Sequence, residues 1–401
     1  MSVRKVLIIV SPTWPHHSSG YGIAVSSSLK ALASHGSISG IRLEFVAISS
    51  EDPPQGVASQ FPHVSFRHIR IQESGLIERF ARSLVTPYPA LVMKYWNRRV
   101  NTDLATAASD IARSADRIGV LIEDVPCGVH FRMLDELLPG AQFALRSHNV
   151  ISDIFVGVRD RTTGAGRLAW WLEVERARRF ERRLLARIGR VWAITQDDAA
   201  TYGRYGVSTS GVFGVSVDCS RYDEVAEGNA QTVLCLGSAD VRKGQGLARF
   251  VAEVWPIVRD SFPTARLVLG GRDTEVFNDP DKGILGLGFV DSENKVLSEG
   301  AIFVNPQDAG SGIKLKSLTA MAARKVLVST RIGVEGVGGV SGRTYYQCET
   351  SLEMGQRIVQ LMGDRGLRLS VGAAGSEFVR SSFSQSRLAE SARSICNALF
   401  A

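Results

Sequence analysis

Residues 302–330, IFVNPQDAGSGIKLKSLTAMAARKVLVST, constrain the fold of this chain more than any other segment. The run IFVNP is continuously apolar and rich in β-formers, as strands buried on both faces of a sheet are. Leu315, Leu318 and Met321 then recur at helical spacing, and KVLVST is a second apolar strand. We therefore predict a βαβ unit whose helix starts at residue 312.

The turn between the first strand and the helix has the composition of an anion site. Glycines at 310 and 312 allow the backbone to approach a ligand closely. The first turn of a helix adds unpaired N–H groups and the positive end of the helix dipole. We expect the amides of Ser311, Gly312 and Ile313 to bind a phosphate. The turn alone leaves open an ordinary strand–turn–helix, in which glycine is needed only for packing.

The length of 401 residues favours two domains, because a single core seldom grows beyond about 250 residues. Strand-like and helix-like runs alternate over residues 1–205 and again over 231–384, which predicts two parallel sheets covered by helices. The expected class is therefore α/β, with two doubly wound, Rossmann-like domains. Residues 206–230 lose this periodicity and are predicted to be a linker. A last helix over 385–401 is expected to cross back to the first domain.

Several functional classes are disfavoured by what the chain lacks. No run of 18 apolar residues is free of charge, and the N-terminal run VLIIV is predicted to be a buried strand rather than a signal segment, so we expect a cytoplasmic protein. The five cysteines have no metal-ligand spacing, which argues against both a zinc site and a disulfide framework. No GxGxxG follows the first strand, which disfavours dinucleotide oxidoreduction.

The positive charge, +7 overall, is unevenly distributed. Residues 159–190 carry ten arginines against four acids, and residues 67–99 form a second basic segment that also contains Tyr and Trp. One interpretation is an amphipathic helix with a solvated arginine face. The other is attraction to a phosphorylated substrate or to the anionic lipid of a membrane, contacted peripherally at its inner face. The sequence alone favours neither interpretation. A nucleic-acid or membrane-surface binder built on the arginine-rich helix is a further hypothesis, although no nucleic-acid partner is expected.

Taken together, these motifs resemble the GT-B glycosyltransferases, and within them the group 1 transferases of glycosyltransferase family 4. The resemblance is strongest in VLCLGSADVRKGQGL (233–247) and GSGIKLKSLTAMAARKVLVSTRIGVEG (310–336). SSGYGIAVSSSLKALASHG (18–36) and RSHNVISD (146–153) are similar to N-terminal elements of the family. The resemblance implies two domains facing across a cleft, and a nucleotide-sugar donor such as a UDP- or GDP-sugar. It also implies a glycan or lipid-linked acceptor, retention at the anomeric carbon, and no metal or other cofactor.

The resemblance also implies roles for individual residues. Lys243 matches the lysine that holds the donor diphosphate, where fixed cations and donors stabilise the charge of the leaving group. The family's preceding arginine is replaced here by Ser238, and Arg242 or Lys314 would supply charge instead. Gly20 and Gly22 match a loop that faces the donor phosphates.

His148 matches a histidine that contacts the donor sugar. At that position it would orient the sugar or the acceptor hydroxyl by hydrogen bonding. A histidine at the end of a strand is also often a satisfied structural residue, which is the alternative.

The signature departs from the family at two acidic positions, occupied here by Ser311 and Thr319. The second carboxylate binds the nucleotide ribose in the family, and a threonine hydroxyl would bind it more weakly by about 1–3 kcal/mol. Glu335 is the candidate substitute. This departure leaves open a degenerate GT-B protein that binds a sugar nucleotide or a partner without turnover.

Overall fold

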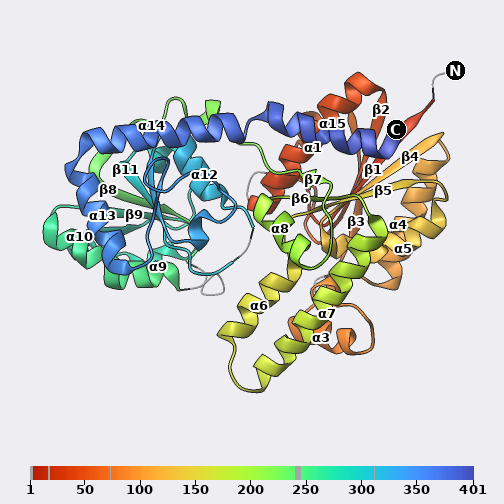
Figure 1. Ribbon diagram of the computed structural model, residues 1–401, viewed down its shortest axis with the longest axis horizontal. Helices are drawn as coiled ribbons and strands as arrows, with labels where there is room; N and C mark the ends of the chain where they lie inside the picture. The colour runs from red at the N-terminus through yellow and green to blue at the C-terminus, as the bar shows by residue number, and fades with distance from the viewer. Residues whose placement is uncertain (1–2, 17–18, 73, 240–244, 311) are drawn as a thin grey trace. The chain divides into compact units, whose positions relative to one another are not determined.

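A computed structural model describes residues 3–16, 19–72, 74–239, 245–310 and 312–401 (Figure 1). The chain forms two compact units, one made of Met1–Ser216 with Gln385–Ala401 and the other of Val217–Ser384. We call them the N-terminal and C-terminal units. The α/β class with two doubly wound sheets is as predicted from the sequence.

The N-terminal unit contains a seven-stranded parallel sheet in the order β3-β2-β1-β4-β5-β6-β7. Its strands are β1 (Lys5–Ser11), β2 (Ile41–Ser49), β3 (Val64–Arg70), β4 (Arg117–Glu123), β5 (Gln142–Ser147), β6 (Val191–Ala193) and β7 (Gly211–Val212). Its helices are α1 (Gly20–Ser39), α2 (Val57–Gln60), α3 (Leu76–Leu84), α4 (Arg98–Ala112), α5 (Phe131–Leu137), α6 (Ile151–Arg161), α7 (Ala165–Ile188), α8 (Gln196–Arg204) and α15 (Gln385–Phe400), with 3₁₀ turns η1 (Val92–Lys94) and η2 (Val125–His130).

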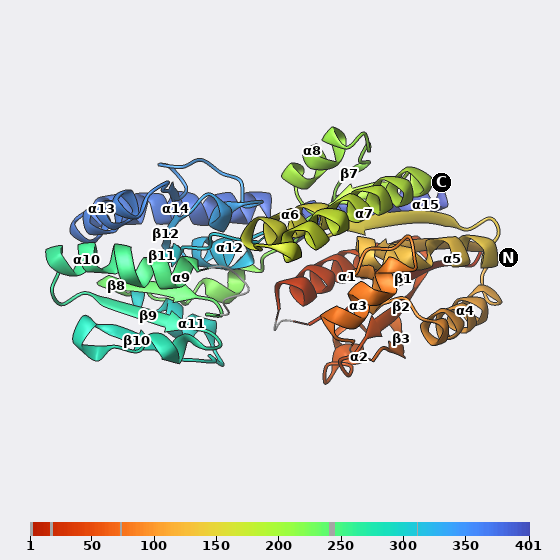
Figure 2. The same cartoon turned by 90° about the horizontal axis from the view of Figure 1, so that it is seen from below.

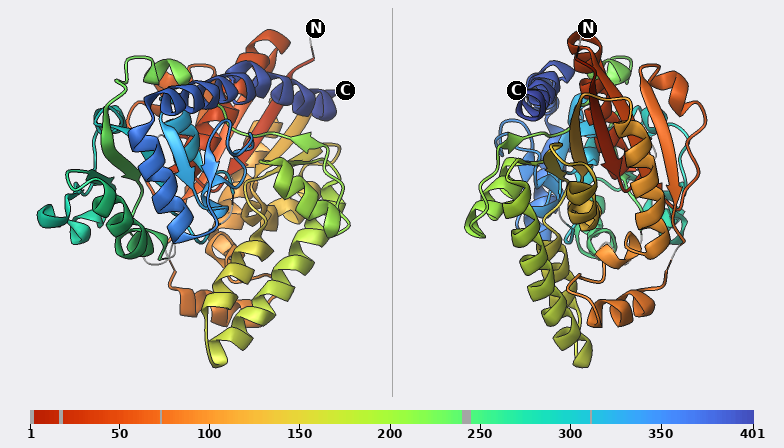
Figure 3. Two further views of the ribbon diagram at one scale, coloured as in Figure 1. Left: turned by 60° about the vertical axis from the view of Figure 1, so that its left-hand side comes forward. Right: turned by 90° about the vertical axis from the view of Figure 1, so that its right-hand side faces the viewer.

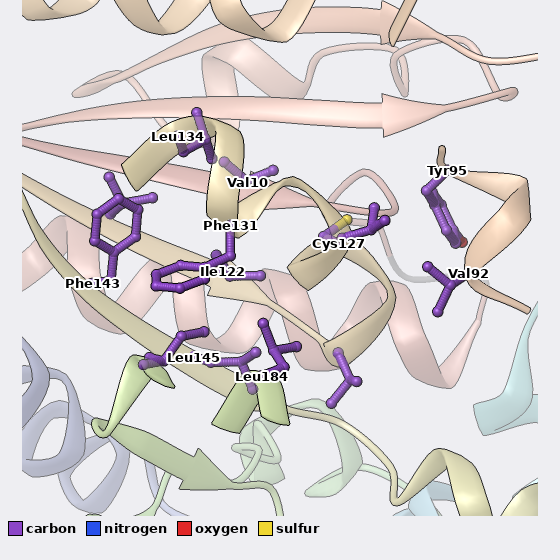
Figure 4. Packing of buried hydrophobic residues seen from close by; sticks show 14 of the residues in the cluster. Val10, Val92, Tyr95, Ile122, Cys127, Phe131, Leu134, Phe143, Leu145 and Leu184 are labelled. Atoms are coloured by element: carbon purple, nitrogen blue, oxygen red, sulfur yellow. The ribbon is translucent and has the colours of Figure 1, made fainter. Parts of the chain in front are cut away.

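Both faces of this sheet are buried, because alternate residues of each strand enter different cores. In β1, Val6, Ile8 and Val10 join the core under α4, α5 and α7, whereas Leu7 and Ile9 join the core under α1 and α15. Figure 4 shows the first of these cores, where side chains from strands, α5 and α7 meet. This two-sided burial explains the continuously apolar strands of the sequence.

The last helix, α15, belongs to the N-terminal unit although the chain reaches it through the C-terminal unit. Leu388, Ile395 and Leu399 are buried in the core that α1 also covers. Ser391 Oγ donates to the Val212 carbonyl at 2.9 Å, and Arg117 donates to the Ala401 carbonyl at 2.7 Å. The helix therefore completes the core that lies under α1.

The C-terminal unit contains a six-stranded parallel sheet in the order β10-β9-β8-β11-β12-β13. Its strands are β8 (Asn229–Leu236), β9 (Arg266–Gly270), β10 (Ile284–Gly286), β11 (Gly300–Asn305), β12 (Val326–Ser329) and β13 (Tyr346–Gln347). Its helices are α9 (Gly246–Arg249), the π-helical η5 (Phe250–Val254), α10 (Trp255–Ser261), α11 (Glu293–Leu297), α12 (Leu315–Ala322), α13 (Ser351–Gly363) and α14 (Arg365–Ser382), with short turns η3 (Cys219–Tyr222), η6 (Thr274–Phe277), η7 (Pro280–Lys282) and η8 (Ile332–Val334).

In this unit α10 and α13 lie next to one another on the same face of the sheet, as Figure 2 shows. Trp255, Val258 and Ile358 pack on the β8, β9 and β11 side chains of one face. Leu318 and Met321 of α12 are fully buried and α12 contacts both β11 and β12. The βαβ unit predicted over 302–330 is thus present as β11, α12 and β12.

Some boundaries differ from those expected. The helix predicted from residue 312 begins only at Leu315, because Lys314 has the non-helical backbone of an N-cap, with φ −91° and ψ 80°. Residues 206–230, expected to be a linker, are divided between the two units at Ser216 and Val217, and β8 already starts at Asn229. The helices α6 and α8 were not predicted. In the described part of the chain, no helix has the length and hydropathy to cross a membrane.

Candidate active site

Each sheet has one topological switch point, where adjacent strands are not consecutive and the following connections diverge. In the N-terminal unit it lies between β1 and β4, and in the C-terminal unit between β8 and β11. Ligands of doubly wound folds bind beyond the carboxyl ends of the strands at such points. Among the described residues, the loops after β8 and β11 contain four of those predicted from the sequence, Ser238, Gly312, Ile313 and Lys314.

The loop after β11 contains the glycine turn, with a backbone conformation that is open to glycine but strained for other residues. Gly310 has a φ of 116° and Gly312 a φ of 75°, which side chains with a Cβ rarely adopt. Gln307 Nε2 donates to the Ala309 carbonyl at 2.6 Å, and a Cβ on Gly310 would lie only 2.7 Å from that nitrogen. Both glycines are therefore required by the shape of the turn itself. Ser311 lies outside the described residues.

Because α12 starts at Leu315, the amides of Gly312 and Ile313 belong to the loop and not to the first helical turn as expected. The first helical amides are those of Leu315 and Lys316, which can have no intrahelical acceptor. The next two amides, of Ser317 and Leu318, already bond the Lys314 carbonyl at 3.0 and 3.2 Å. The amides without a helical acceptor are thus those of Leu315 and Lys316, which lie further along the chain than the amides predicted to bind a phosphate.

Lys314 is buried, with 6% of its surface exposed, and its ammonium has protein partners. Nζ donates to the Gly312 carbonyl at 2.7 Å and lies 3.1 Å from the half-exposed Glu335 carboxylate. Glu335, considered above as a substitute for the missing ribose carboxylate, is thereby placed beside the glycine turn. The ion pair stabilises the turn.

Thr319 uses its hydroxyl proton inside its own helix, where Oγ1 donates to the Leu315 carbonyl at 2.6 Å. A hydroxyl carries one donor and two acceptor lone pairs, so what remains for a ligand is acceptance. The loop after β12 is fixed to α12 and to the end of β11. Ser317 Oγ donates to the Gly333 carbonyl at 2.6 Å, and Asn305 Nδ2 donates to the same oxygen at 3.0 Å.

The described residues that flank the loop after β8 place its end beside the glycine turn. A Cβ on Gly246, the first residue of α9, would lie 1.9 Å from the Pro306 carbonyl oxygen. Arg249 of the same helix lies 3.2 Å from the Asp308 carboxylate. Ser238 is half-buried near the end of β8. Arg242 and Lys243, the two predicted cations of this loop, lie outside the described residues.

In the N-terminal unit, His148 follows β5 and belongs to a buried charged cluster. Glu123 and Arg146 are register partners at the ends of β4 and β5, and Arg146 Nη1 lies 3.0 Å from Glu123 Oε2. His148 Nε2 lies 2.6 Å from the same carboxylate oxygen. Ser28 Oγ donates to the other oxygen at 2.8 Å. Each of these four side chains is at most 2% exposed.

The surrounding side chains of this cluster keep the Glu123 carboxylate ionised. Burial pushes the pKa of Glu123 upward, but the Arg146 guanidinium and the hydrogen bonds from His148 and Ser28 more than offset it and hold that pKa at about 2. Since a carboxylate can only accept, Nε2 of His148 must carry the proton in this bond. Nδ1 of His148 is buried and has no hydrogen-bond partner. A neutral imidazole would then present Nδ1 as an unused acceptor.

Asp124, next to Glu123, has a strained backbone, with a φ of 77° and a ψ of 148°. Its Oδ1 accepts from the amides of Val125 at 2.9 Å and His148 at 3.0 Å, and its Oδ2 accepts from the Tyr21 hydroxyl at 2.7 Å. The Tyr21 ring lies edge-on to the His148 ring, with 4.6 Å between centroids. Burial and Asp124 raise the pKa of Tyr21 well above its usual value, so the phenol stays protonated.

Gly20 and Gly22 were expected in a loop, but they form the first turn of α1. The amide of Gly22 is occupied, since it donates to the N-cap Ser19 Oγ at 3.2 Å. Gly22 lacks a Cβ for a packing reason, because one there would lie 2.4 Å from the His16 ring. The amides of Gly20 and Tyr21 are the donors of this turn that need no helical partner.

The sequence motifs did not indicate Glu123, Arg146, Asp124 or Tyr21 as site residues. A signal was present, since Glu123 and Arg146 are single charges at the ends of otherwise apolar strands, VLIE and FALR. A buried charge at such a position requires a partner. Among the described residues, no group of three or more His, Cys, Asp or Glu side chains is arranged to hold a metal ion.

Comparison with known proteins agrees with this architecture. Residues 230–364 match the family model described as Glycosyl transferases group 1. Sucrose-phosphate synthase from Thermosynechococcus elongatus superposes with a TM-score of 0.70 at 16% identity, over 99% of each chain. The chain has the GT-B fold of these neighbours, and residues 230–364 match the group 1 glycosyltransferase model. The resemblance suggested by the sequence motifs is thereby confirmed.

Two further relatives extend the comparison of this GT-B protein. HepE from Anabaena, solved in complex with UDP, superposes with a TM-score of 0.67 at 12% identity over 98% of this chain and 100% of HepE. A protein of Klebsiella pneumoniae, described as an uncharacterized 44.6 kDa protein in the cps region, is 31% identical over 105 residues. That match covers 23% of this chain and 27% of the relative, so the chain spans about a quarter of the relative's length.

Proposed function

We propose that the protein transfers a sugar from a nucleoside-diphosphate sugar to a glycan or lipid-linked acceptor. Retention at the anomeric carbon, transfer without a metal ion and a place in surface polysaccharide or glycoconjugate biosynthesis belong to this proposal. The Klebsiella pneumoniae protein that matches part of this chain is described as a protein in the cps region, which supports the last of these.

The observation that carries the proposal is the β11–α12 loop at the switch point of a group 1 domain. Its glycines have positive φ, and the amides at the start of α12 have no helical acceptor. Departure of a nucleoside diphosphate leaves negative charge on phosphate oxygens, which such amides stabilise without reorganising. Lys243 would add a cation to the same task, and Ser238, Arg242 and Ser311 remain candidates for donor contact.

His148 would act by accepting a hydrogen bond. With Nε2–H bonded to Glu123, Nδ1 is the buried ring nitrogen that has no partner, and it would accept a hydrogen bond from a hydroxyl of the donor sugar or the acceptor. Glu123 and Arg146 would act through His148 as positioning residues, because they fix its tautomer and ring orientation. Asp124 would hold the backbone of the same histidine by accepting from its amide, and Tyr21 would hold the ring by packing edge-on against it.

The experiment that tests the function uses a panel of UDP-, GDP- and dTDP-sugars. Transfer of radiolabelled sugar to a polysaccharide or lipid-linked acceptor fraction is measured, and donor binding is measured in parallel by isothermal titration calorimetry. We expect one donor to bind and to be turned over. Absence of both transfer and binding for every donor would end the proposal.

A non-catalytic binding protein is the second candidate, and the contact of Thr319 favours it. Its hydroxyl proton is committed to the Leu315 carbonyl, so it cannot replace both hydrogen bonds of a ribose-binding carboxylate. Thr319→Glu distinguishes the two functions. A gain of about tenfold or more in donor affinity with no turnover in the parent chain would indicate degeneration. Loss of an existing activity would show that threonine belongs to a working site.

A further inference from the structure

The exposed large apolar side chains of this chain are concentrated in one region. Among the described residues, 15 large apolar side chains are exposed, and seven of them belong to α3 with its C-cap and to the start of α7. The others are spread over both units. Contiguous exposed apolar surface on a soluble domain usually marks an interaction site. The seven residues are Leu76, Ile77, Leu84, Val85, Leu168, Trp171 and Leu172.

The two helices that carry these residues are fastened to one another. Phe80 of α3 packs edge-on against Trp170 of α7, with 5.1 Å between ring centroids. Ser83 Oγ donates to the buried Glu173 carboxylate at 3.2 Å, and Arg176 donates to the Tyr88 carbonyl at 3.0 Å. Figure 3 shows the α6–α7 hairpin extending beyond the sheet of the N-terminal unit, with α3 beside it. The exposed residues of α3 and α7 therefore flank a common contact.

The outer face of α7 changes from apolar to basic along its length. Leu168 and Leu172 lie one turn apart on this face, and Arg179 follows Leu172 after seven residues, which is two turns. Arg182 lies on the same face. In the described part of the chain no carboxylate lies within 4.0 Å of the Arg179 or Arg182 guanidinium, whereas Glu175 is paired with Arg178 at 3.0 Å. The basic part of the face is thus without neutralising partners.

We propose that this surface, formed by α3 and the outer face of α7, docks the protein onto a bilayer that contains anionic phospholipid. The apolar side chains would enter the headgroup region, where tryptophan is also favoured, and the arginines would contact lipid phosphates. The surface would hold the enzyme next to a lipid-linked acceptor, and in that respect it rests on the proposed function. It lies on different residues from the His148 cluster and the glycine turn.

Charge favours lipid over a second copy of this chain as the occupant. Two copies meeting through the basic part of this face would bring Arg179 and Arg182 of each near those of the other, and like charges at an interface oppose association. An anionic bilayer instead neutralises these charges and accepts the apolar residues without a complementary shape. The exposed tryptophan, leucines and isoleucine beside arginines have the composition of interfacial helices.

The test is flotation of the full chain with vesicles of phosphatidylcholine alone or mixed with phosphatidylglycerol. We expect binding to the mixed vesicles only, and weakening with added salt. The triple variant Ile77→Ser/Leu84→Ser/Leu172→Ser should reduce this partitioning by about tenfold or more. The double variant Arg179→Gln/Arg182→Gln should also reduce it by about tenfold at low salt.

Matched controls use residues of the same types elsewhere. Ile38→Ser/Leu352→Ser/Leu369→Ser removes one exposed isoleucine and two exposed leucines outside the surface. Arg343→Gln/Arg393→Gln removes two exposed arginines, so the net charge matches that of the arginine variant. Both controls should float like the parent chain. Circular dichroism and thermal melting establish that every variant is folded.

Three results would overturn the proposal. The chain could fail to float with either vesicle, the folded triple variant could float as well as its control, or sedimentation could show a dimer that the triple variant abolishes. Donor binding is measured on the same preparations. A chain that binds donor but does not float would contradict the docking surface alone. A chain that floats but binds no donor would contradict the proposed function alone.

Discussion

Nε2 of His148 lies 2.6 Å from Oε2 of Glu123, and both side chains are almost fully buried. The carboxylate accepts a hydrogen bond from Nε2–H, so the tautomer and orientation of the histidine depend on Glu123. Glu123→Gln replaces this acceptor by an amide that can donate to Nε2, which would move the proton to Nδ1. We expect kcat/KM to fall by about a hundredfold, mainly through kcat, and the ¹⁵N NMR signals of His148 to show the other tautomer.

The control for this prediction is Glu173→Gln. Glu173 is also buried and lies 3.3 Å from an arginine, Arg176, but it belongs to the α3–α7 contact. Both variants remove the carboxylate beside an arginine, which is fully buried in the case of Arg146 and partly exposed in the case of Arg176. Both should lose stability, by about 3–5 kcal/mol where the arginine is fully buried. If the two variants lose the same activity once folded protein is compared, Glu123 has no positioning role.

Tyr21 and Asp124 should be energetically coupled through the hydrogen bond of 2.7 Å between them. We expect Tyr21→Phe and Asp124→Asn each to destabilise the fold, with a coupling free energy of about 1–3 kcal/mol for this charge-assisted bond. A double-mutant cycle in urea measures this coupling. A coupling near zero would mean that the strained backbone of Asp124 is held by its amide contacts alone.

The extent to which the site was predictable differs between the two units. The βαβ unit and the glycine turn follow from local periodicity, because strands buried on both faces and a helix with one buried face have distinct patterns. The Glu123–Arg146 pair depends on the register of β4 and β5, which brings together residues 23 positions apart. The start of α12 at Leu315 and the internal bond of Thr319 depend on backbone geometry that no spacing pattern encodes.

Acid should destabilise the N-terminal unit partly through His130. Burial lowers the pKa of His130 to about 4, from an ordinary value of 6.5. Between these values the unfolded chain binds a proton that the folded chain does not, so stability falls as pH drops from 6.5 to 4, by about 3 kcal/mol in full. His130→Gln should remove this part of the pH dependence, whereas the exposed His63→Gln should not. Urea unfolding at several pH values gives the difference curves, and parallel curves for all three chains would contradict the prediction.

Gly310→Ala should weaken donor binding because the turn cannot keep its shape. The new Cβ would lie 2.7 Å from Gln307 Nε2, at a φ of 116° that alanine avoids. The backbone strain is about 1–3 kcal/mol, and we expect donor affinity to fall by about tenfold or more as the amides of the loop move. Gly342→Ala is the matched control, since Gly342 also has positive φ, 84°, but its Cβ would meet nothing within 4 Å. Titration calorimetry with the donor found in the panel compares the two variants. Equal donor affinities of the two variants would show that the glycine turn does not contact the donor. The comparison is fair because both substitutions impose positive-φ strain and only Gly310→Ala disturbs this loop.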